Sequence, residues 1–140
     1  MTDAIANIDT VLDSFDELWS PRILARVNDW KVLVVKVAGE FVWHAHADTD
    51  ELFVVLEGEL DLHLRAADGS GRVVTLGEHD TFVVPRGVEH RPVSERGARL
   101  MLMEPADTLN TGDYAGDVPD HITSTTGIAA ESAAGEPGPA

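Results

Sequence analysis

The chain has 140 residues, of which 44% are hydrophobic, so it is long enough to form one domain with an apolar core. Its 25 acidic and 10 basic residues give a net charge of −15, which disfavours nucleic acid and anionic membranes as partners. It contains no cysteine, which excludes disulfides, thiolate metal ligands and cysteine nucleophiles.

The N-terminal region is predicted to form a short amphipathic helix. Apolar residues recur at helical intervals between Ile8 and Trp19, and Pro21 ends the segment. The first residues are acidic where a secretory signal is basic, and no run approaches the ~18 apolar residues of a membrane span. We therefore expect a cytoplasmic protein without a membrane partner, in which residues 1–22 form a helical extension.

The central part of the chain is predicted to be all-β. From Ile23 to Met103, about seven short β-branched runs alternate with turn residues, and no helical pattern lies between them. The segment ADGSG, residues 67–71, offers glycines that tolerate positive φ in a hairpin loop. This pattern is typical of a β-sandwich or barrel, and we assign residues 23–106 to it.

Residues 107–140 are predicted to be a C-terminal extension in two parts. Residues 104–114 follow the last core strand directly, so we expect them to form a rim over the mouth of the barrel. From Gly127 onward Ala, Gly and Pro dominate, which leaves no apolar anchor. We expect residues 127–140 to be disordered, and their deletion to leave stability and any activity nearly unchanged.

Two histidines one residue apart, His44 and His46, lie in the apolar run FVWHAH. Side chains alternate along a strand, so both imidazoles are expected on one face, about 7 Å apart at their Cα atoms. A turn at residues 47–50 would return Glu51 beside them; Asp50 competes for this position, and the spacing favours Glu51. A single histidine would be explained by a solvated strand face, but two histidines together with a nearby carboxylate favour a metal site. Imidazole and carboxylate together suit Fe(II), Mn, Ni, Zn or Cu without choosing among them.

The same alternation assigns faces elsewhere. Phe41 and Trp43 are expected to point away from the histidines, into a second apolar layer or a subunit contact. In the last core strand either of two faces could line a pocket. One contains Arg99, Met101 and Met103, and the other contains Leu100, Leu102 and Glu104.

A second group of motif residues lies in GEHDTFVVPRGVEHRPV, residues 77–93, which contains a Pro-x-Gly turn and His90. Together the two segments resemble the cupin superfamily, and in finer texture the small single-domain bacterial cupins. The matching residues are Gly39, four residues, His44-x-His46, four residues, Glu51, six residues and Gly58, then Gly77, seven residues, Pro85-x-Gly87, two residues and His90. The spacer after Gly39 is one residue short, and Val93 or Ser94 replaces a frequent Asn. Neither departure touches a ligand.

The resemblance, which covers residues 31–104, implies a cupin double-stranded β-helix, or jelly-roll barrel. In it His44, His46, Glu51 and His90 would hold one divalent metal with one or two open coordination positions. A small organic substrate would bind the metal through oxygen, for oxygenase, isomerase, cyclase or lyase chemistry, and Glu51 would stay bound or act as a catalytic base. The alternative is a metal-dependent binding or sensing module without turnover.

The resemblance also bears on assembly, because small cupins commonly dimerise. We expect a homodimer whose seam uses the N-terminal helix and the face bearing Phe41 and Trp43. The remaining histidines carry no pattern of their own and are expected at the surface. They are His63, His79 and His121.

Overall fold

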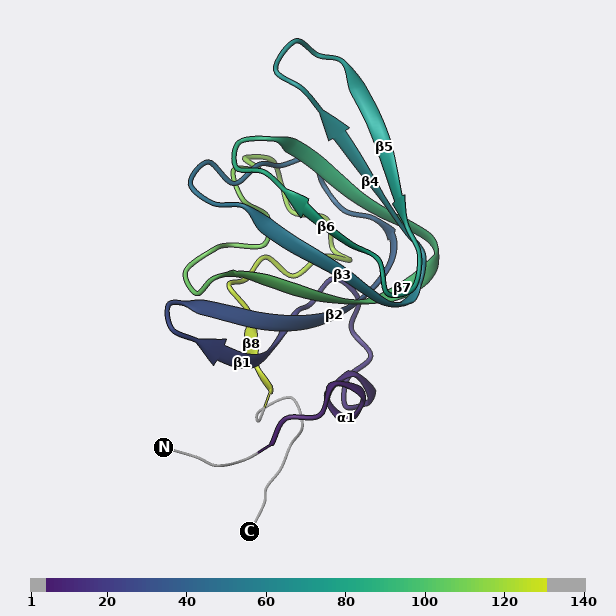
Figure 1. Cartoon of the computed structure of the whole chain (residues 1–140), viewed down its shortest axis with the longest axis vertical. Coiled ribbons are helices and arrows are strands. Elements are labelled where there is room, and N and C mark those ends of the chain that lie inside the picture. Colours follow the sequence, from purple (N-terminus) through teal and green to yellow (C-terminus); the bar gives the residue numbers. More distant parts are fainter. Residues whose placement is uncertain (1–4, 131–140) are drawn as a thin grey trace.

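The structure, a computed structural model, describes residues 5–130 and consists mainly of antiparallel strands curled into a barrel (Figure 1). One short helix, near the N-terminus of the chain, lies beside the barrel (Figure 1). The elements in chain order are α1 (Ile8–Asp13), β1 (Arg22–Val27), β2 (Trp30–Glu40), β3 (Glu51–Gly58), β4 (Leu60–Arg65), β5 (Gly71–Leu76), β6 (Thr81–Val84), β7 (Glu89–Pro105) and β8 (Ile128–Ala129). The predicted all-β jelly roll with a short N-terminal helix is confirmed.

The long strand β7 organises the sheet, because it pairs antiparallel with β2, β3 and β4. The hydrogen-bonded order is β5-β4-β7-β2-β1-β8, and β3 also pairs with β6. The predicted hairpin loop joins β4 to β5, with Gly69 at φ +87°. Inward-facing apolar side chains of these strands form one core inside the barrel.

The helix is shorter than the predicted residues 8–19, since α1 ends at Asp13 and Ser14 caps it. Asp13 is the last helical residue and two more acidic residues follow at positions 16 and 17, and negative charge is unfavourable at a helix C-terminus. The chain then turns through Trp19, which has φ +54°. This turn lets Phe15 pack in the cluster under the helix while Trp19 enters the barrel core.

The run after β2 is not the continuous strand that the sequence predicted. Phe41 keeps the inward face of Val35 and Val37, but residues 41–43 form no strand, so the alternation between Phe41 and His44 is lost. Phe41 consequently lies inside the barrel, with its ring 5.1 Å from that of Trp19. The expectation that Phe41 points away from the histidines was wrong, and Phe41 is not available for a subunit seam.

The C-terminal segment returns across the barrel to the first strand, where Figure 1 shows β8 beside β1. The pairing is parallel, with Arg22 opposite Ile128 and Ile23 opposite Ala129. Gly127 lies so close to Ile23 and Leu33 that a Cβ would approach their side chains to 2.7 and 2.9 Å. The predicted disorder from residue 127 is therefore wrong for residues 127–130, which fill a space between apolar side chains. Residues 131–140 lie outside the described residues.

Truncation after Thr126 is expected to lower the free energy of unfolding by at least about 1 kcal/mol. The deletion exposes the edge of β1 and removes Ala130, which is buried in the cluster under α1. Truncation after Ala130 is the control, because it keeps β8. Urea unfolding of both variants measures the difference, and equal stabilities would contradict a structural role for residues 127–130.

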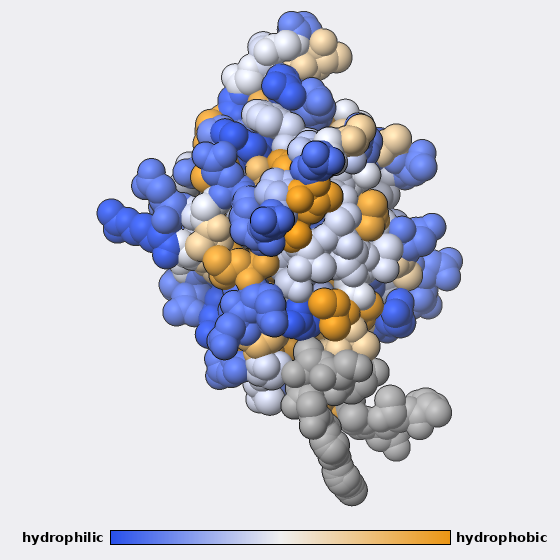
Figure 2. Space-filling view, turned by 180° about the vertical axis from the view of Figure 1, so that it is seen from behind, coloured by the Kyte–Doolittle hydropathy of each residue, from blue (hydrophilic) through white to orange (hydrophobic). Residues whose placement is uncertain are grey.

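The outer surface is dominated by hydrophilic side chains, and on the face shown in Figure 2 the hydrophobic residues form small separate patches. The larger apolar side chains exposed within residues 5–130 are scattered along the sequence. No helix in this part of the chain is long and apolar enough to cross a membrane.

Candidate metal centre

Four side chains that could hold a metal ion meet inside the barrel. His44, His46, Glu51 and His90 offer ligand atoms that all lie within 4.8 Å of one another. The carboxylate is central, because Glu51 Oε1 lies 3.3 Å from His46 Nε2 and 3.4 Å from His90 Nε2. All four residues are at most 7% exposed. The structure therefore brings together the four residues that the two motifs single out.

Backbone hydrogen bonds hold the histidine run in place although it is not a regular strand. His44 and His90 form an isolated bridge, in which each N–H donates to the other residue's carbonyl at 3.0 and 2.8 Å. Gly87 N–H donates to the His46 carbonyl at 2.8 Å, and Gly87 itself has φ +79°. The Pro-x-Gly turn thus ends β6 and also fixes His46 against β7.

Hydrogen bonds at Nδ1 orient the rings of His44 and His90 so that Nε2 of each ring is available as a ligand. Nδ1 of His44 lies 2.9 Å from the Val42 carbonyl, and Nδ1 of His90 lies 2.9 Å from the Val88 carbonyl. A carbonyl only accepts, so each Nδ1 carries the proton and each Nε2 keeps a lone pair. Three buried atoms at the centre lack a hydrogen-bond partner, namely His46 Nε2, His90 Nε2 and Glu51 Oε1. Buried unpaired acceptors converging on one point fit a cation.

Burial sets the protonation of this cluster. It lowers the pKa of His44 to about 3, and the neighbouring His90 acts in the same direction, so His44 is neutral. Burial acts to raise the pKa of Glu51, but the close rings of His46 and His90 outweigh it and hold that pKa below its usual range. A neutral imidazole and an ionised carboxylate are the forms that bind metals.

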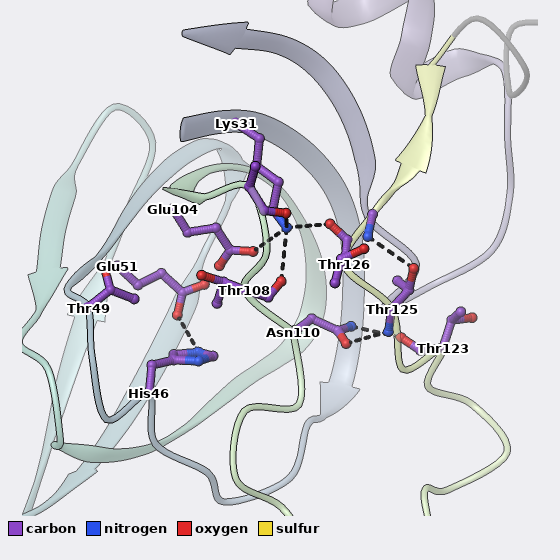
Figure 3. Close-up of polar contacts among 12 residues, drawn as sticks. Lys31, His46, Thr49, Glu51, Glu104, Thr108, Asn110, Thr123, Thr125 and Thr126 are labelled. Atoms are coloured by element: carbon purple, nitrogen blue, oxygen red, sulfur yellow. Dashed lines mark hydrogen bonds and ion pairs between the residues drawn. The ribbon is translucent and has the colours of Figure 1, made fainter. Parts of the chain in front are cut away.

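A second buried carboxyl group, that of Glu104, contacts Glu51. Burial, followed by the charge of Glu51, raises the pKa of Glu104 to about 9, so Glu104 is protonated at neutral pH and hydrogen-bonds to Glu51. On its other side, Glu104 Oε2 lies 3.5 Å from Lys31 Nζ (Figure 3). The four candidate metal ligands are therefore connected to a buried polar network, in which Glu51 contacts Glu104 and Glu104 contacts Lys31.

Lys31 is fully buried and ties this chain to the C-terminal segment. Its Nζ donates to the carbonyls of Ala106 and Thr108, each at 2.9 Å, and to that of Thr126 (Figure 3). Burial lowers the pKa of Lys31, but three carbonyl acceptors require three N–H donors, which only the ammonium offers. Lys31 is thus a charged anchor for the segment that follows β7.

A pocket of about 400 Å³, its open mouth included, leads to His44 and Glu51. Of the two predicted alternatives for β7, the face containing Leu100 and Leu102 lines it. Asn110 adds a wall from the C-terminal segment. The same segment packs on the centre itself, because a Cβ on Gly112 would approach the Ala45 carbonyl to 2.5 Å and His44 Cδ2 to 3.0 Å.

The other candidates lie outside this centre. Asp50, the competitor of Glu51, instead accepts a hydrogen bond from the backbone N–H of Arg86 at 2.9 Å. Arg91 pairs with Glu40 at 3.1 Å on the surface. His63 lies edge-on to Trp43, with 6.4 Å between ring centroids, away from the four residues.

Sequence reasoning missed Lys31 and the role of Glu104. Both lie on inward faces of their strands, in register with buried neighbours such as Leu33 and Leu102. A charged residue at an inward position of an otherwise apolar face is a signal for a buried polar network. Strand alternation alone could have raised that possibility for both residues.

A jelly-roll barrel with a buried imidazole and carboxylate cluster at the end of an apolar pocket defines a cupin-type domain. Residues 31–104, more than half of the chain, match the family described as Cupin domain. The chain belongs to the cupin family.

Individual proteins and solved structures are similar to this chain. The uncharacterized protein YdbB of Bacillus subtilis is 38% identical over 85 residues, which are 61% of this chain and 72% of YdbB. The crystal structure of a cupin-2 domain containing protein from Shewanella frigidimarina is 42% identical, with a TM-score of 0.67 over 72% of this chain and 94% of that one. Hydroquinone 1,2-dioxygenase from Sphingomonas sp. TTNP3, with 4-hydroxybenzoate bound, shares the fold at 17% identity, with a TM-score of 0.59 over 76% and 81% of the chains.

The metal-free protein is expected to lose stability as the pH falls from 6.5 towards 3. An unfolded chain protonates His44 near 6.5, whereas the folded chain keeps it neutral down to about 3. The unfolded state then binds more protons, and the free energy of unfolding falls by up to ~1.4 kcal/mol per pH unit. Urea unfolding in EDTA measures this slope. His44→Gln should flatten the slope and His63→Gln should not; equal slopes in all three proteins would contradict the assignment.

Proposed function

We propose that the protein is a metal-dependent enzyme that acts on a small organic substrate, which coordinates the metal. The observation that carries this proposal is the buried cluster of unpaired acceptor atoms at the inner end of an open pocket. His44, His46, Glu51 and His90 would hold the ion. A metal bound only for stability has no need of a pocket that leads to it.

The residues around the metal would each have a separate role in the reaction. When bound, a divalent metal would supply Lewis-acid or redox chemistry to a substrate donor atom. Glu51 is ionised at neutral pH, so it can serve as a ligand or accept a substrate proton. Glu104 holds one side of that carboxyl group through its hydrogen bond. Apolar walls such as Phe53 and Leu100 exclude water from the reacting end. Oxygenase, isomerase, cyclase and lyase reactions are all compatible with this arrangement.

One observation favours a second function, a metal-dependent binding or sensing module. Apart from His44 and Glu51, none of the residues that line the pocket is titratable. No acid or base independent of the metal cluster is therefore available for chemistry on a bound molecule. Both functions predict metal binding, and only the first predicts turnover.

The test begins with metal analysis of protein purified without added metal. Metal-free protein is then loaded anaerobically with Fe(II), Mn(II), Ni(II) or Zn(II), and oxygen uptake and product formation are followed over a panel of small phenols, enols and ketones. The proposal expects turnover that is lost in His46→Ala. Metal and ligand binding without any product would favour the binding module, and the lack of stoichiometric binding of any ion would overturn both.

The homodimer stays a prediction, with a seam reduced to α1 and the face of Trp43. The Trp43 ring already stacks on Arg65, whose guanidinium carbon lies 4.2 Å from the ring centroid. Light scattering at micromolar concentration is expected to give twice the 15.1 kDa of one chain. A monomer at that concentration would contradict the prediction.

A further inference from the structure

The pocket wall is apolar almost to the metal centre. Its side walls come from β2, β3, β7 and the run before His44, which are far apart in sequence and close in the barrel. The apolar residues that carry the argument are Val35, Val37, Phe41, Phe53, Leu100 and Leu102. A molecule that fills this space is surrounded by carbon on most sides.

The polar groups on the wall are already paired within the protein. Trp19 Nε1 donates to the Ala38 carbonyl at 2.8 Å. Asn110 Nδ2 donates to the Thr123 carbonyl at 2.7 Å, and its Oδ1 accepts from Thr125 N–H at 2.8 Å (Figure 3). Trp19 has no donor left for a bound molecule, and Asn110 keeps one of its two Nδ2 hydrogens. Among the described residues that line this pocket, Glu51 is the one with a buried side-chain atom that lacks a partner.

No cation compensates an anion along this wall, since none of the residues that line it is Lys or Arg. The nearby ammonium of Lys31 is occupied by three carbonyls and by Glu104. A carboxylate or phosphate placed away from the centre would therefore lose its hydration without a partner, at a large free-energy cost. The net charge of −15 opposes its approach as well.

From these contacts we infer the class of the substrate: a small molecule with one polar end, whose donor atoms reach the metal centre, and an uncharged apolar body that fills the pocket. This inference rests on the proposed function, because the polar end needs the metal. It excludes sugar phosphates and compounds with a second anionic group, such as dicarboxylates. It fits phenols, enols and ketones with a hydrocarbon ring or branched chain.

The test uses hydroxamic acids that share one metal-binding group and differ in their bodies. Cobalt(II)-loaded protein is titrated with acetohydroxamic, benzohydroxamic, and 3- and 4-carboxybenzohydroxamic acids, by visible absorption in 0.5 M NaCl to screen long-range repulsion. Burial of the ring should make benzohydroxamic acid bind at least ten-fold more tightly than acetohydroxamic acid. Each added carboxylate should weaken binding at least ten-fold relative to benzohydroxamic acid.

Two variants locate the effect in the pocket. Phe41→Leu, which alters the wall, should reduce the preference for benzohydroxamic over acetohydroxamic acid at least three-fold. Phe82→Leu, which alters a partly buried ring that packs on the core outside the pocket lining, should leave that preference unchanged. Equal affinities for the charged and uncharged rings, or no gain from the ring, would overturn this inference alone. Failure to take up cobalt would overturn the proposed function and this inference with it.

Discussion

Replacing His46 by Ala is expected to abolish stoichiometric metal binding while the barrel stays folded. The ring offers Nε2 to the centre, and this buried atom has no hydrogen-bond partner in the protein. The contact that fixes this part of the chain is Gly87 N–H to the His46 carbonyl, which alanine retains. Loss of one ligand of four typically lowers affinity by orders of magnitude, whereas the fold loses only the packing of one ring.

The measurement is the metal content after dialysis against an excess of Zn(II) and then metal-free buffer, together with the circular dichroism spectrum. His63→Ala is the matched control, since His63 lies on β4 and contacts Trp43 rather than the centre. The control should keep one equivalent of metal. A full equivalent in the His46 variant would show that His46 is not a ligand.

Replacing Lys31 by Met should lower the free energy of unfolding by about 3–5 kcal/mol. Methionine matches the length of the apolar stem but leaves three buried carbonyls without their donor and removes the ammonium group beside Glu104. Residues 106–126 should loosen together, because the three carbonyls belong to that segment. Faster proteolysis within residues 106–126 should accompany the lower stability.

The control for Lys31 is Lys36→Met on the same strand. Lys36 Nζ donates to one carbonyl, that of Phe15, at 2.6 Å, so its loss should cost only about 1 kcal/mol. Urea unfolding at pH 7 compares the two variants with the wild-type chain. Equal losses in the two variants would mean that Lys31 does not anchor the C-terminal segment.

The sequence predicted the β-barrel from its short strand runs and turns, and it predicted the four residues of the centre from their resemblance to the two cupin motifs. The His-x-His pair, Glu51 and the Pro-x-Gly turn before His90 carry their information within about fifteen residues each. Alternation of faces failed between Phe41 and His44, because residues 41–43 form no strand. Where a strand is interrupted depends on its partner strands and is not encoded in the alternation itself.

The C-terminal segment was the least predictable part for a similar reason. Its anchors are backbone carbonyls, such as those of Ala106 and Thr126, and carbonyls are the same in every residue. The partner is Lys31, 75 and 95 residues away. Composition indicated a segment unable to fold alone, which says nothing about whether a finished barrel will hold it.

The parallel pairing of β8 with β1 has a consequence for how the chain is made. The edge of β1 stays uncovered during synthesis until β8, about a hundred residues further along the chain, has been made. The hydrogen bond from Lys31 Nζ to the Thr126 carbonyl likewise cannot form until Thr126 has been synthesised. Contacts of such long sequence separation slow folding. The edge of β1 can therefore be covered only after β8 has been synthesised, when the strands that surround the centre have already left the ribosome.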